Sequence, residues 1–273
     1  MLLTIPSKGR AAKQVTLHNF KKFAKTMMPV LIVPDAEQRT YRNNNPDVEV
    51  VGTPPEIVGI SKTREWILTT FAKERKAEFV GMTDDDMDFC YRPDPKAAPL
   101  LTITTPEKMM DMLYRMETWL ESGFVHVGLS ARQGNNNPYK NEQGENGLHE
   151  YRDATRMMNF YIYNTAKLAT LDVKLGRMDV MEDFDLTLQL LRKGYPNRVL
   201  FDYCWNQRGS GALGGCSTYR TAAMQANAAR RLAELHPDFV NVTTKKSKVN
   251  WKGLEERVDV IVGWRKAYES SGK

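Results

Sequence analysis

The residues from Glu78 to Phe89 combine an apolar run with a cluster of carboxylates. The apolar part predicts a buried strand, and Asp84, Asp85 and Asp86 follow it directly. Alternate side chains of an extended chain face the same way, so Asp84 and Asp86 are expected on one side. Neighbouring carboxylates repel each other unless a cation lies between them, and hard oxygen ligands suit Mg²⁺ or Mn²⁺. The stretch therefore predicts a metal–diphosphate site with Asp84 and Asp86 as ligands, and a solvated acidic turn is the alternative.

Two other kinds of acidic site were compared with this stretch. An EF-hand loop opening at Asp84 needs glycine at its sixth position and glutamate at its twelfth. Those positions hold Phe89 and Pro95, which excludes a calcium loop of that type. A phosphotransferase with an aspartate nucleophile also carries Asp-x-Asp after a strand, usually close to the chain start. Here a substantial βα-like segment precedes the acidic stretch, so this second alternative is disfavoured but kept.

Composition places the chain among ordinary soluble globular proteins. It has 273 residues, 41% of them apolar and 26% charged, which suits one large domain or one domain with an appendage. No apolar run approaches the ~18–20 residues that span a bilayer, and residues 1–6 predict a first strand. Three cysteines without metal-like spacing favour a reducing cytoplasm. The net charge of +6 favours polyanionic partners, nucleic acid among them.

Apolar runs and helical periodicity alternate along the chain, which predicts an α/β fold with a mostly parallel sheet and helices on both faces. A long polar loop is expected at 130–152, and the glycine-rich stretch 209–215 leads into the last part of the chain. The predicted strands are 1–6, 30–33, 48–51, 79–82, 124–129, 159–163 and 199–203. The predicted helices are 16–28, 62–73, 107–122, 166–171, 181–193, 221–235 and 254–268.

Three separated motifs resemble those of GT-A-type glycosyltransferases. Gly59-Ile60-Ser61-Lys62-Thr63-Arg64 is similar to the Gly-x-Ser/Ala-x-x-Arg helix start of family-2-like transferases. Thr83-Asp84-Asp85-Asp86 is similar to their Asp-x-Asp metal motif, and Glu182-Asp183-Phe184-Asp185-Leu186 to their Glu-Asp helix start. The resemblance covers roughly 1–205 and implies a GT-A-like catalytic domain there. Residues 206–273 are then expected to form a glycine-rich loop and a helical segment packed on the same domain.

Within that superfamily the chain looks like the phage TET-associated glycosyltransferases and the related base J glucosyltransferases. The short start Ile5-Pro6-Ser7-Lys8-Gly9-Arg10 and the lack of a membrane anchor point to this group. The resemblance implies transfer of a sugar from UDP-glucose or UDP-N-acetylglucosamine to a hydroxymethylated pyrimidine in DNA, such as 5-hydroxymethylcytosine. It also implies Mn²⁺ or Mg²⁺ as cofactor and action in the cytoplasm, that of the host if the source is a phage.

The resemblance assigns roles to particular side chains. Asp183 is the expected general base of an inverting displacement, with Glu182 as the alternative base or as a group that orients the acceptor. Family members often take a third metal ligand, commonly histidine, from the later part of the domain. No histidine lies between His149 and His236, so no third ligand is assigned. The expected donor-binding residues are Pro6, Ser7, Gly9, Arg10, Asp35, Arg64, Asp84, Asp85 and Arg208; for Arg64 a surface ion pair is the alternative.

A DNA acceptor requires a basic rim, and base flipping where the target atom lies in a duplex. A solvated surface is the alternative role for each basic group. The expected acceptor contacts are Arg132, Asn135, Lys245, Lys246, Lys248 and Trp251. Three other functions compete with this hypothesis. They are a transferase with a polysaccharide, lipid or protein acceptor, a nucleotidyltransferase with the same metal, and a non-catalytic nucleic-acid-binding protein.

Overall fold

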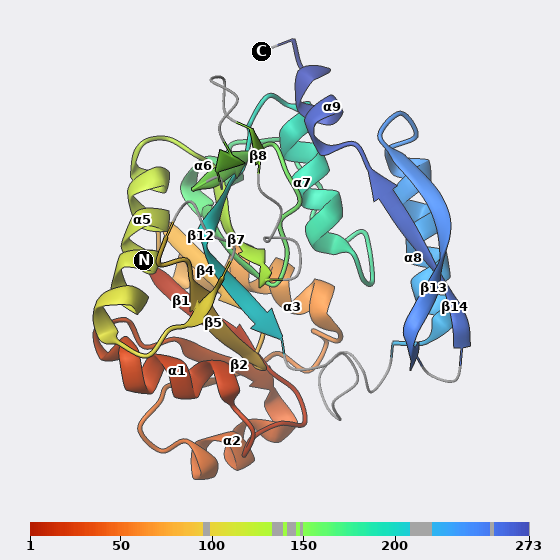
Figure 1. Cartoon of the computed structure of the whole chain (residues 1–273). Coiled ribbons are helices and arrows are strands. Elements are labelled where there is room, and N and C mark those ends of the chain that lie inside the picture. The colour runs from red at the N-terminus through yellow and green to blue at the C-terminus, as the bar shows by residue number, and fades with distance from the viewer. Residues whose placement is uncertain are drawn as a thin grey trace.

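The computed structural model describes residues 1–94, 99–132, 139–140, 146–147, 150–207, 220–251 and 254–272. Its centre is a large sheet with the strand order β3-β2-β1-β4-β11-β7-β12-β5-β6 (Figure 1). The strands with parallel neighbours are β1 (Leu2–Pro6), β2 (Val30–Pro34), β3 (Val50–Thr53), β4 (Phe79–Thr83), β7 (His126–Ala131) and β12 (Arg198–Gln207). The strands with antiparallel neighbours only are β5 (Met87–Tyr91), β6 (Leu101–Thr102), β10 (Tyr151–Asp153) and β11 (Phe160–Asn164).

Helices cover both faces of this sheet. The main helices are α1 (Val15–Phe23), α2 (Gln38–Asn44), α3 (Ile60–Trp66), α5 (Pro106–Glu121), α6 (Thr165–Ala169) and α7 (Glu182–Arg192). On one face α1 and α5 bury Phe20, Met112 and Met116 against the strands. On the other face α3 continues through a π-helical turn (Ile67–Phe71) into α4 (Ala72–Glu74), and this segment packs beside α7. The predicted α/β class with helices on both faces is confirmed.

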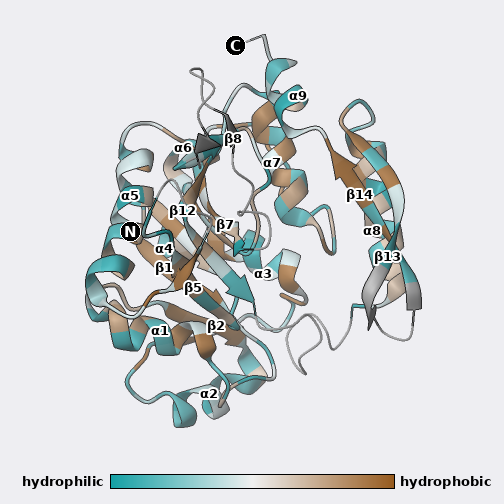
Figure 2. Cartoon of the chain, viewed as in Figure 1, coloured by the Kyte–Doolittle hydropathy of each residue, from teal (hydrophilic) through white to brown (hydrophobic). Residues whose placement is uncertain are grey.

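The hydropathy pattern explains this layering. Figure 2 shows the hydrophobic colour concentrated on strands of the central sheet such as β2. Leu31, Ile32 and Val33 of that strand are each at most 1% exposed, so it is buried on both faces. A continuous apolar run is typical of a strand in a sheet covered on both sides. The apolar runs at 30–33 and 79–82 therefore predicted their strands correctly.

The last part of the chain differs from its prediction. The helix predicted at 254–268 is wrong, because β14 (Leu254–Val262) occupies most of that range and α9 (Trp264–Glu269) follows. β14 pairs only with β13 (Val240–Trp251), and this ribbon lies against α8 (Ala222–Leu235), apart from the central sheet (Figure 1). Alternating Val258, Val260 and Val262 suit a strand with one covered face.

An apolar cluster joins this C-terminal part to helix α7. Phe184 and Leu188 of α7 share it with Leu232 of α8 and Val260 of β14. A buried polar network adds to the attachment, since His236 Nε2 lies 2.8 Å from Asp185 Oδ1. The α8–β13–β14 unit therefore packs directly on the helix that carries Glu182 and Asp183.

Smaller differences concern element ends and short strands. Helix α1 ends at Phe23, earlier than the predicted 28, and a 3₁₀ turn (Lys25–Met27) follows it. A second 3₁₀ turn (Asp35–Glu37) leads into α2, and neither α2 nor β5 was predicted. The polar stretch 130–152 contains two short paired strands, β8 (Tyr139–Lys140) and β9 (Asn146–Gly147). None of the described helices combines the length and apolarity needed to cross a bilayer.

Candidate active site

The acidic turn at 84–86 lies where β4 ends beside β1. Thr16, at the start of α1, donates through Oγ1 to the Asp84 carbonyl oxygen at 2.6 Å. The same hydroxyl accepts from the Met87 amide at 2.9 Å, on the far side of the turn. The carbonyl of Asn159, directly before β11, accepts the Asp84 amide at 3.1 Å. The backbone of the turn is thus held from two sides, which fixes the direction of its three carboxylates.

Asp85 and Asp86 face the residues that follow β1. Arg10 Nη1 lies 2.5 Å from Asp85 Oδ1 and 3.0 Å from Asp86 Oδ2. Ser7 Oγ donates to the second oxygen of Asp85 and also bonds the Tyr41 hydroxyl at 2.8 Å. Asp85 is 4% exposed, and its burial raises its pKa although Ser7 and Arg10 act in the opposite direction. The turn is therefore not the solvated acidic turn of the alternative reading.

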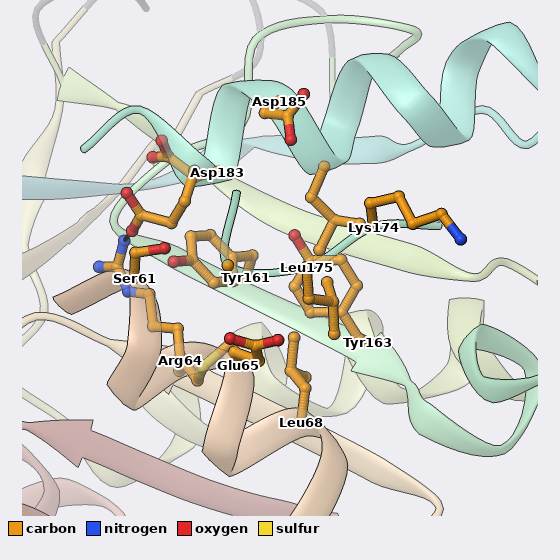
Figure 3. A pocket seen from close by; sticks show the side chains of 14 residues that line it. Ser61, Arg64, Glu65, Leu68, Tyr161, Tyr163, Lys174, Leu175, Asp183 and Asp185 are labelled. Atoms are coloured by element: carbon orange, nitrogen blue, oxygen red, sulfur yellow. Dashed lines mark hydrogen bonds and ion pairs between the residues drawn. The ribbon is translucent and has the colours of Figure 1, made fainter. Parts of the chain in front are cut away.

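Arg64 on α3 joins the acidic turn to the start of α7. Its Nη2 lies 2.8 Å from Asp84 Oδ1, and its Nη1 pairs with Glu182 Oε1. The arginine is 9% exposed, and its guanidinium carbon lies 5.3 Å from the centre of the Tyr161 ring (Figure 3). Arg64 is thus a buried bridge between two motifs 98 residues apart in the chain, and not a surface ion pair.

Asp183 has a different environment from its neighbour Glu182. Its Oδ1 accepts from the Phe184 amide at 3.0 Å, and Met181 before the helix has a left-handed φ of 65°. Burial first, and the charge of Glu182 second, raise the pKa of Asp183 to about 6, although Arg64 acts in the opposite direction. A carboxylate with this pKa is ionised at neutral pH and still basic enough to accept a proton.

A pocket opens between α3 and α7 over the surface of β4 and β11. Leu68 and Tyr163 contribute apolar surface, and the charged groups that line the pocket include Arg64 of α3 with Glu182 and Asp183 of α7 (Figure 3). Ser61 Oγ and Arg64 Nε are buried there and have no hydrogen-bond partner among the described residues. The lining residues are Ser61, Arg64, Glu65, Leu68, Met82, Tyr161, Tyr163, Lys174, Leu175, Gly176, Glu182, Asp183, Asp185 and Leu186.

The donor set of the acidic turn fits a hard divalent cation. Asp84 and Asp86 supply carboxylate oxygens, and burial together with the charges of Asp86 and Asp85 raises the pKa of Asp84 to about 7, against the effect of Arg64. Such a concentration of negative charge favours a cation. Among the described residues no group of three or more His, Cys, Asp or Glu side chains is arranged to hold a metal. Two carboxylates are enough for Mg²⁺, which usually completes its shell with water and substrate phosphates.

Gly59 explains why the motif before α3 begins with glycine. It caps the helix at φ 89° and ψ 161°, a region that is essentially restricted to glycine. Its carbonyl accepts the Thr63 amide at 3.0 Å and so starts the helix that carries Arg64.

We therefore expect Gly59→Ala to lower the free energy of unfolding by about 1–3 kcal/mol, measured by urea denaturation. Gly263→Ala is the matched control, because Gly263 also caps a helix but at φ −86°. A Cβ at Gly263 would meet its nearest atom, Lys266 Cβ, at 3.5 Å, which is ordinary contact. Equal losses in the two variants would contradict the assigned backbone requirement.

The other predicted site residues lie in several places. Pro6 ends β1, and the Gly9 amide donates to Glu37 Oε2 at 2.7 Å, while Asp35 is exposed after β2. Arg132 directly follows β7 and donates to the Leu100 carbonyl at 3.4 Å. Lys245 and Lys246 are exposed on β13, and Lys245 Nζ lies 3.0 Å from Asp259. Arg208 and Asn135 lie outside the described residues, as do the side chains of Lys248 and Trp251 on β13.

Sequence reasoning missed four residues that shape the turn: Thr16, Tyr41, Asn159 and Gln207. Thr16 stands at a helix start, the one local signal among them. Asn159 has a left-handed φ of 66°, and asparagine is among the residues that tolerate this region. Gln207 donates to Asp86 from the end of β12, and nothing in its local sequence marks that contact.

The geometry agrees with a comparison of the whole chain with known families. The model of the family described as TET-Associated Glycosyltransferase matches residues 1–215. The chain belongs to this family. It is therefore a glycosyltransferase, and the predicted enzyme class is confirmed.

Individual relatives share little sequence identity with this chain. The β-glucosyl-HMC-α-glucosyl-transferases of Enterobacteria phages T2 and T6 are each 23% identical to this glycosyltransferase over 223 residues, which cover 77% of this chain and 73% of theirs. Among solved structures, the mannosyltransferase PcManGT of Pyrobaculum calidifontis, determined with GDP-Man and Mn²⁺, superposes with a TM-score of 0.51 at 12% identity. That match covers 86% of this chain and 62% of PcManGT, and it supports the GT-A-like fold alone.

Proposed function

We propose that this TET-associated glycosyltransferase moves a sugar from a UDP-sugar to the hydroxyl of 5-hydroxymethylcytosine in DNA, with Mn²⁺ or Mg²⁺ as cofactor. The observation that carries the proposal is the Arg64 bridge, because it brings the acidic turn and the start of α7 into one site. A donor diphosphate at Asp84 and Asp86 would then lie within reach of a base at Asp183.

The donor half of the site extends from the end of β1 to the acidic turn. Ser7, Gly9 and Arg10 follow β1, where the nucleotide base and ribose would lie, and Arg10 already pairs with both Asp85 and Asp86. Asp84 and Asp86 are the proposed metal ligands. A bound Mn²⁺ or Mg²⁺ would supply charge neutralisation for the leaving diphosphate.

The contacts of Glu182 and Asp183 support different roles for the two residues. Glu182 forms an ion pair with Arg64, which makes it a positioning group for the two motifs that Arg64 joins. Asp183 is therefore the proposed base. It would accept the proton of the acceptor hydroxyl as that oxygen bonds to the anomeric carbon and the bond to the diphosphate oxygen breaks. One such displacement inverts the anomeric centre.

The raised pKa of Asp183 predicts the pH dependence of the reaction. A base must be deprotonated, so kcat is expected to rise about tenfold per pH unit below pH 6 and to level off above it. Saturating Mn²⁺ should be present throughout, because protonation of Asp84 near pH 7 would otherwise weaken metal binding. A flat profile between pH 5 and 7 under these conditions would contradict the assignment of Asp183.

The acceptor assignment rests on the family and on charge. The curated relatives carry HMC in their names, and the net charge of +6 favours a polyanion. Lys245 and Lys246 on β13 and Arg132 directly after β7 are the proposed DNA contacts, together with Lys248, Trp251 and Asn135.

Mass spectrometry of nucleosides tests the proposal. DNA containing 5-hydroxymethylcytosine would be incubated with the protein, Mn²⁺ and a panel of UDP-sugars, with EDTA as control, and then digested. Gain of one hexose or N-acetylhexosamine on the modified base, lost in EDTA, is the expected result. Release of UDP without any modified nucleoside would support the donor half and reject this acceptor.

The names of the T2 and T6 relatives favour one second candidate. They describe transfer of an α-glucosyl group to β-glucosyl-HMC, an acceptor that already carries a sugar. The same assay on DNA that carries β-glucosyl-HMC distinguishes the two acceptors. If this second acceptor is the right one, a hexose is added to β-glucosyl-HMC and none to 5-hydroxymethylcytosine. The anomeric configuration of the product, read by NMR, then tests inversion, because an α product from an α-linked donor requires net retention.

A further inference from the structure

Gln207 brings the end of β12 to the acidic turn. β12 runs antiparallel to β5, with Gln207 opposite Met87, the residue directly after Asp86. Its Nε2 donates to both carboxylate oxygens of Asp86, at 3.0 Å to Oδ1 and 3.2 Å to Oδ2. Arg10 Nη1 donates to Oδ2, at 3.0 Å. Gln207 therefore contacts both oxygens of the carboxylate.

A neighbouring residue holds the Gln207 amide in this orientation. Asn159 Nδ2 lies 3.5 Å from Gln207 Oε1, so the amide oxygen faces away from Asp86. The Asn159 carbonyl also accepts the Asp84 amide at 3.1 Å. The Asn159–Gln207 pair thus contacts Asp84 through its backbone and Asp86 through its side chain. Both proposed metal ligands depend on the same pair.

We propose that Gln207 is a positioning residue that orients Asp86 for a divalent cation. The inference rests on the metal site of the proposed function. A carboxylate offers about four lone-pair positions, so bonds from Gln207 leave room for a cation on Asp86. An amide suits this task because it donates without adding charge beside three aspartates. Groups that orient metal ligands typically contribute 10–100-fold to metal affinity.

Titration with Mn²⁺, followed by the EPR signal of the free ion, tests the role without any need for turnover. Gln207→Leu is expected to weaken Mn²⁺ binding about 10–100-fold. Gln207→Asn keeps the amide but retracts it by one methylene. We expect this variant to fold readily and to lose a similar amount of Mn²⁺ affinity. In both variants kcat should recover at saturating Mn²⁺ while the Mn²⁺ concentration at half-maximal rate rises.

Asn206→Leu is the matched control. Asn206 is the preceding residue of β12, so its side chain faces the opposite side of the strand. The Mn²⁺ affinity of the Asn206→Leu variant should equal that of the wild-type protein. If both Gln207 variants bound Mn²⁺ as tightly as the wild-type protein does, this inference alone would be overturned. A wild-type protein that binds no Mn²⁺ would overturn the metal dependence in the proposed function as well.

Discussion

Asp183→Asn is expected to lower kcat by about 100- to 10 000-fold, the usual contribution of a general base. The asparagine side chain has nearly the same shape but cannot take the proton of the acceptor hydroxyl. It retains an oxygen that can accept the Phe184 amide, so the start of α7 should persist. Steady-state kinetics with the modified DNA and a UDP-sugar measure the loss, and a Mn²⁺ titration should show unchanged metal affinity.

Two further variants are compared with Asp183→Asn in this measurement. Asp179→Asn, at an exposed position four residues earlier, should leave kcat unchanged. Glu182→Gln removes the charge that pairs with Arg64, so its main expected effect is on stability. If Glu182→Gln abolished turnover while Asp183→Asn kept more than a tenth of it, the two roles would have to be exchanged.

Arg64→Met is expected to destabilise the protein by about 3 kcal/mol in EDTA, the lower end for breaking a buried ion pair. The change leaves Asp84 and Glu182 without their shared cation, and both carboxylates are largely buried. Asp84 retains 29% exposure, which lets water compensate part of the loss and places the value at the lower end. Urea unfolding followed by circular dichroism gives the free energy.

A surface pair provides the comparison for Arg64. Arg75, which ends the same helical segment, pairs with Glu49 in a solvent-exposed position, so Arg75→Met should cost no more than about 1 kcal/mol. Arg64→Lys keeps the charge but cannot bridge two carboxylates with a planar fork, so an intermediate loss is expected. Mn²⁺ should restore part of the stability of Arg64→Met, because a cation at Asp84 replaces the missing charge. Equal losses for Arg64→Met and Arg75→Met would refute the bridging role.

The proposed base and the proposed metal ligands show how much can be predicted from motifs and their spacing. Asp84 and Asp86 were chosen because an apolar run followed by carboxylates marks a strand end locally, and Asp183 because its helix start resembles a motif of GT-A-type glycosyltransferases. The structure places all three in one region, although their catalytic roles stay proposals. Arg64 was chosen as a donor-binding residue, and its partners turned out to be Asp84 and Glu182. No local pattern records which carboxylates a buried arginine meets.

The C-terminal ribbon shows the opposite case. The helix predicted over 254–268 is wrong for most of its length, because Leu254–Val262 form β14. The strand forms because β13 supplies hydrogen bonds along its length and α8 covers one face. Short apolar periodicity fits a helix or a strand about equally, and a partner distant in the chain decides between them.

The sequence by itself determined the α/β class, the buried strands of the central sheet, the acidic turn at 84–86 and the charged start of α7. Each of these follows from interactions between residues close together in the chain, such as apolar runs, caps and like-charge clusters. Only the tertiary structure decided that Arg64 joins Asp84 to Glu182, that Gln207 and Asn159 hold the turn, and that Val240–Trp251 pairs with Leu254–Val262 as a ribbon. These contacts join segments up to 121 residues apart, and they exist only once the sheet brings the strand ends together.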